Sequence, residues 1–197
     1  MTERSTMNAS GHAKGRARPA VFLDRDGTLI EDCGDLTEPS HVAFFEDTVP
    51  SLRRLNEHFD LFIVTNQSGV AKGNLSMADV DRVNSHVSAY LEAHGVPILA
   101  TYVCPHQRSD QCRCIKPEPY FLLRAREQFG INLPGSFTVG DHPHDVALAE
   151  RVGGTGIYVL TGHGVKHRSE VAPGTIIKSG IKEAAEYILA HATDGQA

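Results

Sequence analysis

The fold is indicated first by residues 20–30, AVFLDRDGTLI, where four apolar residues lead directly into Asp24-Arg25-Asp26-Gly27-Thr28. A short apolar run of this kind predicts a fully buried strand. The glycine that follows permits a tight turn. Two carboxylates in a turn say little by themselves, because aspartate and glycine occupy turns for local hydrogen-bonding reasons. The significance of Asp24 and Asp26 therefore depends on what the rest of the chain places beside them.

The same kind of apolar run recurs along the chain and alternates with helical patterns. Strands are predicted at residues 61–65, 98–103, 136–140 and 156–160, and helices at 76–95, 119–130, 145–152 and 181–191. The first of these helices opens with Ser76 and Asp79, the spacing of a capping box. This alternation predicts an α/β fold of three layers, with a mostly parallel sheet between helices. Ligands of such sheets bind at the carboxyl ends of the strands.

Length and composition restrict the kind of protein. The chain has 197 residues, 41% of them hydrophobic and 22% charged, which suits a single globular domain over residues 19–192. Residues 1–18 are polar and are predicted to form a disordered tail, and residues 193–197 a short C-terminal tail. The net charge of −5 argues against binding to nucleic acid or an anionic membrane. With no apolar run long enough to span a bilayer and no signal-peptide core, we expect a cytoplasmic monomer.

Polar side chains gather where the predicted strands end. Asp141 and Asp145 follow the strand at 136–140, so a second carboxylate pair stands at a strand end. Two such pairs could converge on Mg²⁺, which prefers oxygen ligands. The strand at 61–65 ends in Thr65-Asn66-Gln67-Ser68-Gly69, whose hydroxyl, amide and backbone groups suit phosphate oxygens. Lys116 is a candidate counter-charge for phosphate.

Three of the four cysteines lie within eleven residues. Cys104, His106, Cys112 and Cys114 offer three sulfurs and one imidazole at short spacing, a pattern typical of Zn²⁺. Four protein ligands leave no open position for water, so we expect a structural site that folds this loop. Cys33 has no partner in sequence and is interpreted as a free thiol.

Taken in order, DRDGT, the strand-terminal threonine, the downstream lysine and GDxxxD resemble the four motifs of the haloacid dehalogenase (HAD) superfamily of phosphotransferases. The resemblance implies a Rossmann-like HAD fold. The spacing of 39 residues from Asp26 to Thr65 leaves room for a flap and one helix but not for a large cap domain. The resemblance makes Asp24 the nucleophile and Asp26 the acid/base. Thr65 and Lys116 would stabilise the transferring phosphoryl group. Mg²⁺ would be held by Asp24, the Asp26 carbonyl and Asp141, and Asp145 would orient Lys116 or the metal ligands.

The zinc loop, together with FLDRDGTLI and VTNQSGVAKG, resembles one HAD subfamily, the D-glycero-D-manno-heptose 1,7-bisphosphate phosphatases and the related histidinol-phosphate phosphatases. This implies a small phosphorylated metabolite as substrate. Substrate contacts carried over from the subfamily fall on Asp32, Cys33, Gly34, Asp35, Asn66, Gln67, Ser68 and Ile115. Two of the subfamily's usual basic residues are replaced, an arginine by Ile115 and a lysine by His142. The remote phosphate then needs another partner, for which Arg113, Lys72 and Arg25 are candidates.

Three functions stay open on the sequence. The first is a Mg²⁺-dependent phosphatase that removes the C7 phosphate of a heptose bisphosphate. The second is a phosphatase of histidinol phosphate, whose ammonium the acidic residues at 31–35 would bind, or of a small sugar phosphate other than the heptose, whose hydroxyls they would bind. The third is a non-catalytic, zinc-stabilised module that binds a phosphorylated ligand. His142 and His144 are interpreted as exposed loop residues.

Overall fold

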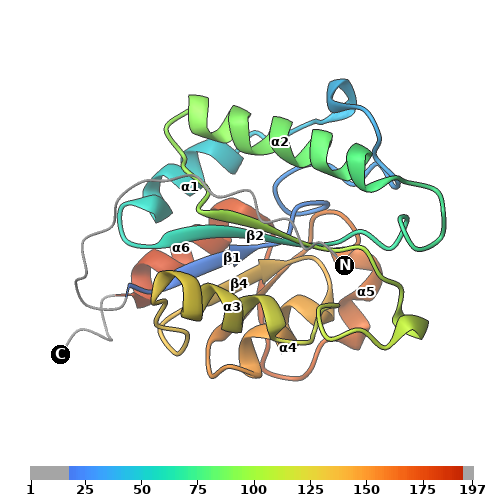
Figure 1. The fold of residues 1–197 in the computed structure, drawn as a ribbon. Coiled ribbons are helices and arrows are strands. Elements are labelled where there is room, and N and C mark those ends of the chain that lie inside the picture. Colours follow the sequence, from blue (N-terminus) through green and yellow to red (C-terminus); the bar gives the residue numbers. More distant parts are fainter. Residues whose placement is uncertain (1–17, 193–197) are drawn as a thin grey trace.

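A computed structural model describes residues 18–192, and its centre is a six-stranded parallel sheet (Figure 1). The strand order is β3-β2-β1-β4-β5-β6, and every neighbouring pair is parallel. The strands are β1 (Ala20–Leu23), β2 (Asp60–Asn66), β3 (Ala100–Cys104), β4 (Phe137–Gly140), β5 (Thr155–Val159) and β6 (Ile176–Lys178). The five predicted strands are confirmed with end shifts of one or two residues. The sequence prediction lacks β6, a three-residue edge strand that is only half-buried.

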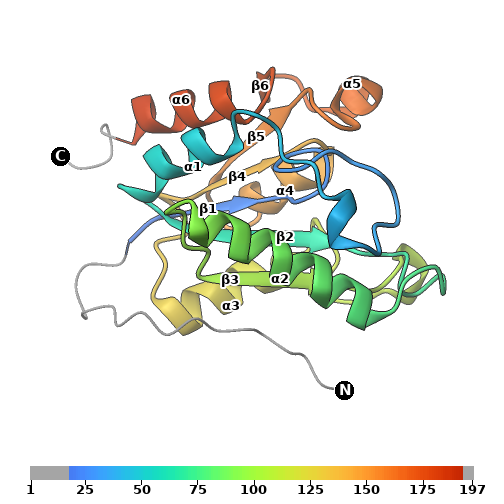
Figure 2. The same cartoon turned by 90° about the horizontal axis from the view of Figure 1, so that it is seen from above.

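Helices cover both faces of the sheet, as the alternating pattern predicts (Figure 2). They are α1 (Thr48–Asn56), α2 (Met77–Ala93), α3 (Tyr120–Phe129), α4 (Pro143–Glu150), α5 (Gly164–His167) and α6 (Ile181–His191). Short 3₁₀ turns form η1 (Pro39–His41), η2 (Arg108–Asp110) and η3 (Arg168–Glu170). Helices α1, α2 and α6 pack into one apolar cluster against the sheet, while α3 and α4 pack into a second cluster.

Helix α2 forms for the reason that its sequence indicates. The Ser76 hydroxyl accepts a hydrogen bond from the Asp79 N–H, and the Asp79 carboxylate accepts one from the Ser76 N–H, so the capping box is present. Val80, Val83 and Val87 then recur on one face and are buried. The helix therefore covers the β1-β2-β3 side of the sheet, next to the segment that follows Asp26.

Both predicted ends of the helix at 145–152 are wrong by two residues, since α4 spans Pro143–Glu150. The sequence pattern starts a helix at Asp145, but α4 starts at Pro143, with His142 as its N-cap and Asp145 as the third helical residue. Proline is favoured in the first turn because its missing N–H has no partner there. The Asp145 carboxylate returns to the His142 N–H, which fixes the side chain at the carboxyl end of β4.

The insertions around the sheet are small. Between β1 and α1 the described chain contains only the turn η1 and a loop, and between β3 and α3 it contains η2 and the cysteine cluster. No described segment therefore builds a large cap over the sheet, as the spacing from Asp26 to Thr65 predicts. No helix of residues 18–192 has the length and apolarity to cross a bilayer. The predicted tails, apart from Arg18, lie outside the described residues.

Candidate active site

The carboxyl ends of β1, β2, β4 and β5 open into one cavity of about 590 Å³. This is the edge at which parallel sheets bind their ligands. Its lining comprises Asp24, Asp26, Asp32, Gly34, Asp35, Thr65, Asn66, Gln67, Ser68, Gly69, Lys72, Gln107, Arg108, Ile115, Lys116, Asp141, His142, His144, Asp145 and His163. Every catalytic candidate from the sequence is therefore in one place, although the residues span more than a hundred positions.

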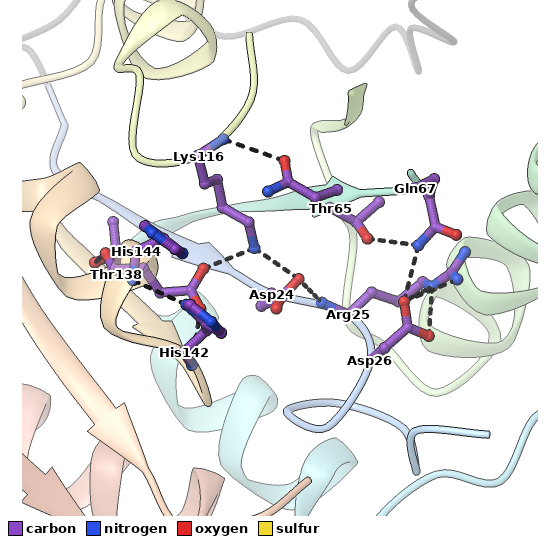
Figure 3. Close-up of polar contacts among 11 residues, drawn as sticks. Asp24, Arg25, Asp26, Thr65, Gln67, Lys116, Thr138, His142 and His144 are labelled. Carbon is purple, nitrogen blue, oxygen red and sulfur yellow. Dashed lines mark hydrogen bonds and ion pairs between the residues drawn. The ribbon is translucent and has the colours of Figure 1, made fainter. Parts of the chain in front are cut away.

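A buried lysine connects two of the carboxylates. Lys116 Nζ lies 2.8 Å from Asp24 Oδ1 and 2.6 Å from Asp145 Oδ1, and its side chain is only 5% exposed (Figure 3). Asp24 follows β1, and its N–H donates to the Val139 carbonyl of β4, which fixes the two strand ends side by side. Asp145 thus contacts Lys116, and its orienting role stays a prediction.

This centre has more carboxylates than positively charged groups. The atoms of Asp24, Asp141 and Asp145 that could hold a metal lie within 4.8 Å of one another, with Lys116 as the ammonium between two of them. Burial raises the pKa of Asp24 to about 6, against the lowering effect of Lys116. Burial and the Asp24 charge raise the pKa of Asp141 to about 7. For Lys116, burial opposes the charged form, but the two aspartates outweigh it and raise its pKa.

Asp141 is held from the other side by the loop after β5. The His163 N–H donates to Asp141 Oδ2 at 2.6 Å, and Thr161 Oγ1 donates to the Gly27 carbonyl at 2.6 Å. Gly27 has φ +73°, and a Cβ there would overlap the Asp141 carboxylate. Glycine is therefore required for the backbone and for the space. The sequence interpretation missed His163, although it follows a predicted strand as the other site residues do.

Asp26 points away from Lys116 and is held by its neighbours (Figure 3). Arg25 is 1% exposed and donates from Nη2 to Asp26 Oδ2 at 2.9 Å and from Nη1 to Asn84 Oδ1 at 2.7 Å. Gln67 Nε2 donates to the same Asp26 oxygen at 2.8 Å and to Thr65 Oγ1 at 2.8 Å. Burial raises the pKa of Asp26, and the charge of Arg25 opposes that rise. Arg25 is therefore wrong as a candidate for a remote phosphate.

The expected substrate contacts divide into three groups. Asp32, Gly34, Asp35, Ser68 and Ile115 line the cavity. Two others also line it but hold protein groups: Asn66 Oδ1 accepts from the Lys116 N–H at 3.2 Å, and Gln67 bridges Asp26 and Thr65. Cys33 is exposed and does not line the cavity, so the structure does not bring it to the site.

His142 and His144 are not the exposed loop residues of the sequence interpretation. They cap and begin α4, line the cavity and stack with ring centroids 4.2 Å apart. Burial lowers the pKa of each to about 4, and neighbouring positive charges act in the same direction. Both imidazoles are therefore neutral near pH 7, and His142 does not replace the positive charge of a lysine.

The cysteine cluster has the dimensions of a tetrahedral metal site. Cys114 Sγ lies 3.3 Å from Cys104 Sγ, 3.6 Å from Cys112 Sγ and 3.4 Å from His106 Nδ1. Four ligands around Zn²⁺, with Zn–S of about 2.3 Å, put sulfur atoms about 3.8 Å apart. All three cysteines are free thiols, so no disulfide competes for the sulfurs. This donor set fits Zn²⁺, and the oxygen set around Asp24 fits Mg²⁺.

The comparisons with known proteins agree with this site. Residues 113–184 match the HAD-hydrolase-like family model. The D-glycero-beta-D-manno-heptose-1,7-bisphosphate 7-phosphatase of Vibrio cholerae is 34% identical over 184 residues, 88% of this chain and 97% of that protein. The enzyme of the same name from Escherichia coli K12 is 34% identical over 171 residues, 82% of this chain and 89% of that protein.

A solved structure shows the same fold. The D,D-heptose 1,7-bisphosphate phosphatase from B. bronchiseptica, crystallised with magnesium and phosphate, has a TM-score of 0.79 at 27% identity and covers 87% of this chain and 98% of that one. The chain therefore belongs to the HAD superfamily of hydrolases and, within it, to the family of heptose bisphosphate phosphatases, which are phosphoric monoester hydrolases.

Proposed function

We propose that this chain is a Mg²⁺-dependent phosphatase that removes the C7 phosphate of D-glycero-D-manno-heptose 1,7-bisphosphate through an aspartyl-phosphate. The observation that carries the proposal is the contact of Lys116 with both Asp24 and Asp145, beside Asp141 in one cavity. A buried ammonium at this position suits the equatorial oxygens of a transferring phosphoryl group. The relatives named for this activity are 34% identical over most of their length.

The residues have complementary parts in the reaction. An Asp24 oxygen attacks phosphorus as the bond to the sugar oxygen breaks, and the Asp26 carboxyl gives its proton to the departing alkoxide. Asp26 then takes a proton from water, which attacks the aspartyl-phosphate, releases inorganic phosphate and restores Asp24. Lys116 and the Thr65 hydroxyl stabilise the phosphoryl oxygens in both steps.

Asp24, Asp141 and the Asp26 carbonyl are the proposed magnesium ligands. Three carboxylates and one lysine leave two negative charges, which a divalent cation would neutralise. When bound, Mg²⁺ supplies positive charge to the phosphoryl oxygens and keeps Asp24 ionised. We also propose that Cys104, His106, Cys112 and Cys114 hold a structural Zn²⁺, and that the protein acts as a monomer in the cytoplasm on a small metabolite.

The test is phosphate release by the purified protein with Mg²⁺, on both anomers of heptose 1,7-bisphosphate and on histidinol phosphate. We expect kcat/KM for one heptose anomer to exceed that for histidinol phosphate at least about a hundredfold, because a sugar carrying a second phosphate makes contacts that histidinol phosphate lacks.

The opposite ranking would assign the chain to histidinol phosphate, whose ammonium would face Asp32 and Asp35. Phosphate release from neither ester, with binding retained, would favour the non-catalytic phosphate-binding module. A third result, similar rates on many small sugar phosphates, would support the reaction type but not the heptose substrate.

A further inference from the structure

The cavity contains more positive charge than the reacting phosphate uses. Lys116 is committed to Asp24 and Asp145. Arg108 and Lys72 also line the cavity, both are exposed, and within residues 18–192 neither forms an ion pair with a carboxylate. These two cations are therefore available to an anion from solution.

Arg108 and Lys72 lie on two loops that are joined to each other. Lys72 lies in the loop after β2. In this loop the Gln67 N–H donates to the Cys104 carbonyl at 2.7 Å, and the Ala71 N–H donates to the Pro105 carbonyl at 3.1 Å. Arg108 comes three residues after Pro105, at the start of η2. The two cations thus belong to one continuous side of the cavity.

The position of Arg108 is fixed from the opposite wall. Its Nη2 lies 2.8 Å from Nδ1 and 2.6 Å from Nε2 of His144, the second residue of α4. An imidazole carries no negative charge, so this contact leaves the guanidinium charge uncompensated. The contact holds the arginine between the cysteine loop and the catalytic end of β4.

The other arginines near the site are already engaged. Arg25 is buried between Asp26 and Asn84. Arg113 donates to the Tyr120 hydroxyl, lies 4.4 Å from the centre of that ring and does not line the cavity. Ile115, the residue directly before the catalytic lysine, is apolar. Arg108 is therefore the arginine of the described chain whose charge faces the cavity without a carboxylate partner.

We infer that Arg108 and Lys72 form a second anion subsite, which binds the non-reacting phosphate of a bisphosphorylated substrate. The inference rests on the proposed function and specifies its substrate class, a phosphate ester with a second phosphate at its other end. A guanidinium matches two phosphate oxygens with parallel N–H donors, and an ammonium adds a point charge. Asp32 and Asp35 line the cavity as acceptors that suit sugar hydroxyls between the two phosphates.

The test compares two substrates that differ by one phosphate, heptose 1,7-bisphosphate and heptose 7-phosphate, each assayed with Mg²⁺. We expect Arg108→Ala to reduce the ratio of the two kcat/KM values at least about tenfold, chiefly through KM for the bisphosphate. Arg108→Lys should recover part of the ratio, because it restores the charge without the planar fork. Lys72→Ala should act in the same direction with a smaller effect.

Arg113→Ala is the matched control, since it removes an arginine of the same loop that does not line the cavity, and it should leave the ratio unchanged. An unchanged ratio in Arg108→Ala, with the wild type active on both esters, would overturn the inference and leave the proposed function intact. A wild type that releases phosphate from neither ester would overturn both.

Discussion

At the level of single residues, the main feature of the active centre is its excess of buried negative charge. Asp24, Asp141 and Asp145 lie close together, and Lys116 forms ion pairs with Asp24 and Asp145. Burial disfavours the ionised carboxylates, and this one ammonium neutralises their charge only in part. Burial, with a smaller contribution from the neighbouring carboxylates, raises the pKa of Asp24 to about 6 and that of Asp141 to about 7. A centre of this kind favours either protons or a divalent cation.

Magnesium binding should therefore depend on pH. Below pH 6 the metal must displace protons from Asp24 and Asp141, so we expect the affinity for Mg²⁺ to rise at least about tenfold between pH 5.5 and pH 8. The stability of the metal-free protein changes in the opposite direction. Because folding raises both pKa values, the two carboxyl groups add to the free energy of unfolding at low pH, and this contribution is lost as pH rises through 6 to 7.

Calorimetric titration with Mg²⁺ at the two pH values, together with thermal unfolding with and without the metal, measures both effects. The stabilisation by Mg²⁺ should be larger at pH 8 than at pH 5.5. Equal affinity at the two pH values would show that these carboxylates do not bind the metal.

Gly27 offers a second test at this scale. Gly27→Ala should destabilise the fold by about 1–2 kcal/mol, because φ is +73°, and should also weaken Mg²⁺ binding, because the new Cβ displaces the Asp141 carboxylate. Gly153→Ala is the control: its φ is +76°, but nothing lies within 4 Å of its Cβ. Denaturant unfolding should show a loss in both variants, and only Gly27→Ala should bind Mg²⁺ more weakly. Equal Mg²⁺ affinity in the two variants would contradict this account.

At the scale of elements, strand ends and loop hydrogen bonds position the site. Lys116 comes two residues after Cys114, and its N–H is held by Asn66 at the end of β2. The cysteine cluster therefore anchors the segment that carries Lys116, the proposed partner of the phosphoryl oxygens. The loop has few apolar residues, so a bound metal would supply much of the free energy that orders it.

Replacing a metal ligand should accordingly affect both folding and catalysis. Cys112→Ser should lower the midpoint of thermal unfolding and reduce kcat, because the zinc ion in the loop that positions Lys116 loses one of its four ligands. Cys33→Ser, an exposed thiol outside the cavity, is the control and should change neither quantity. Metal content measured by mass spectrometry should show about one zinc per chain in the wild type and in Cys33→Ser. Wild-type stability in a zinc-free Cys112→Ser variant would contradict the proposed structural role.

The sequence predicted the elements whose signals are local. Helix α6 and the capping box of α2 follow from apolar periodicity and cap residues. The gathering of Asp24, Thr65 and Asp141 in one cavity follows from their places at strand ends. The early start of α4 was missed because His142 is an unusual N-cap. Arg108 and His163 were missed because their positions depend on which loops meet at the edge of the sheet. Local sequence patterns do not predict contacts between loops that are distant in the chain.

At the scale of the whole molecule, the parallel sheet brings residues from four strand ends to one cavity, and no described cap covers it. Substrate selection then falls to the loops at the rim, from residues 31–46 and 104–116 and the loop after β5. The outer cations Arg108 and Lys72 and the inner cation Lys116 suit the two ends of a small bisphosphate. We therefore propose that the fold positions the reacting groups and that the rim selects the substrate.

Asp24 is the proposed nucleophile of this phosphatase. The most direct measurement is phosphate release from heptose 1,7-bisphosphate with Mg²⁺ by the wild type and by Asp24→Asn, with circular dichroism to verify that the variant is folded. We expect kcat to fall by at least about 10⁴-fold in the folded variant, because an amide cannot form the aspartyl-phosphate. A folded Asp24→Asn protein that retains activity within tenfold of the wild type would contradict the account.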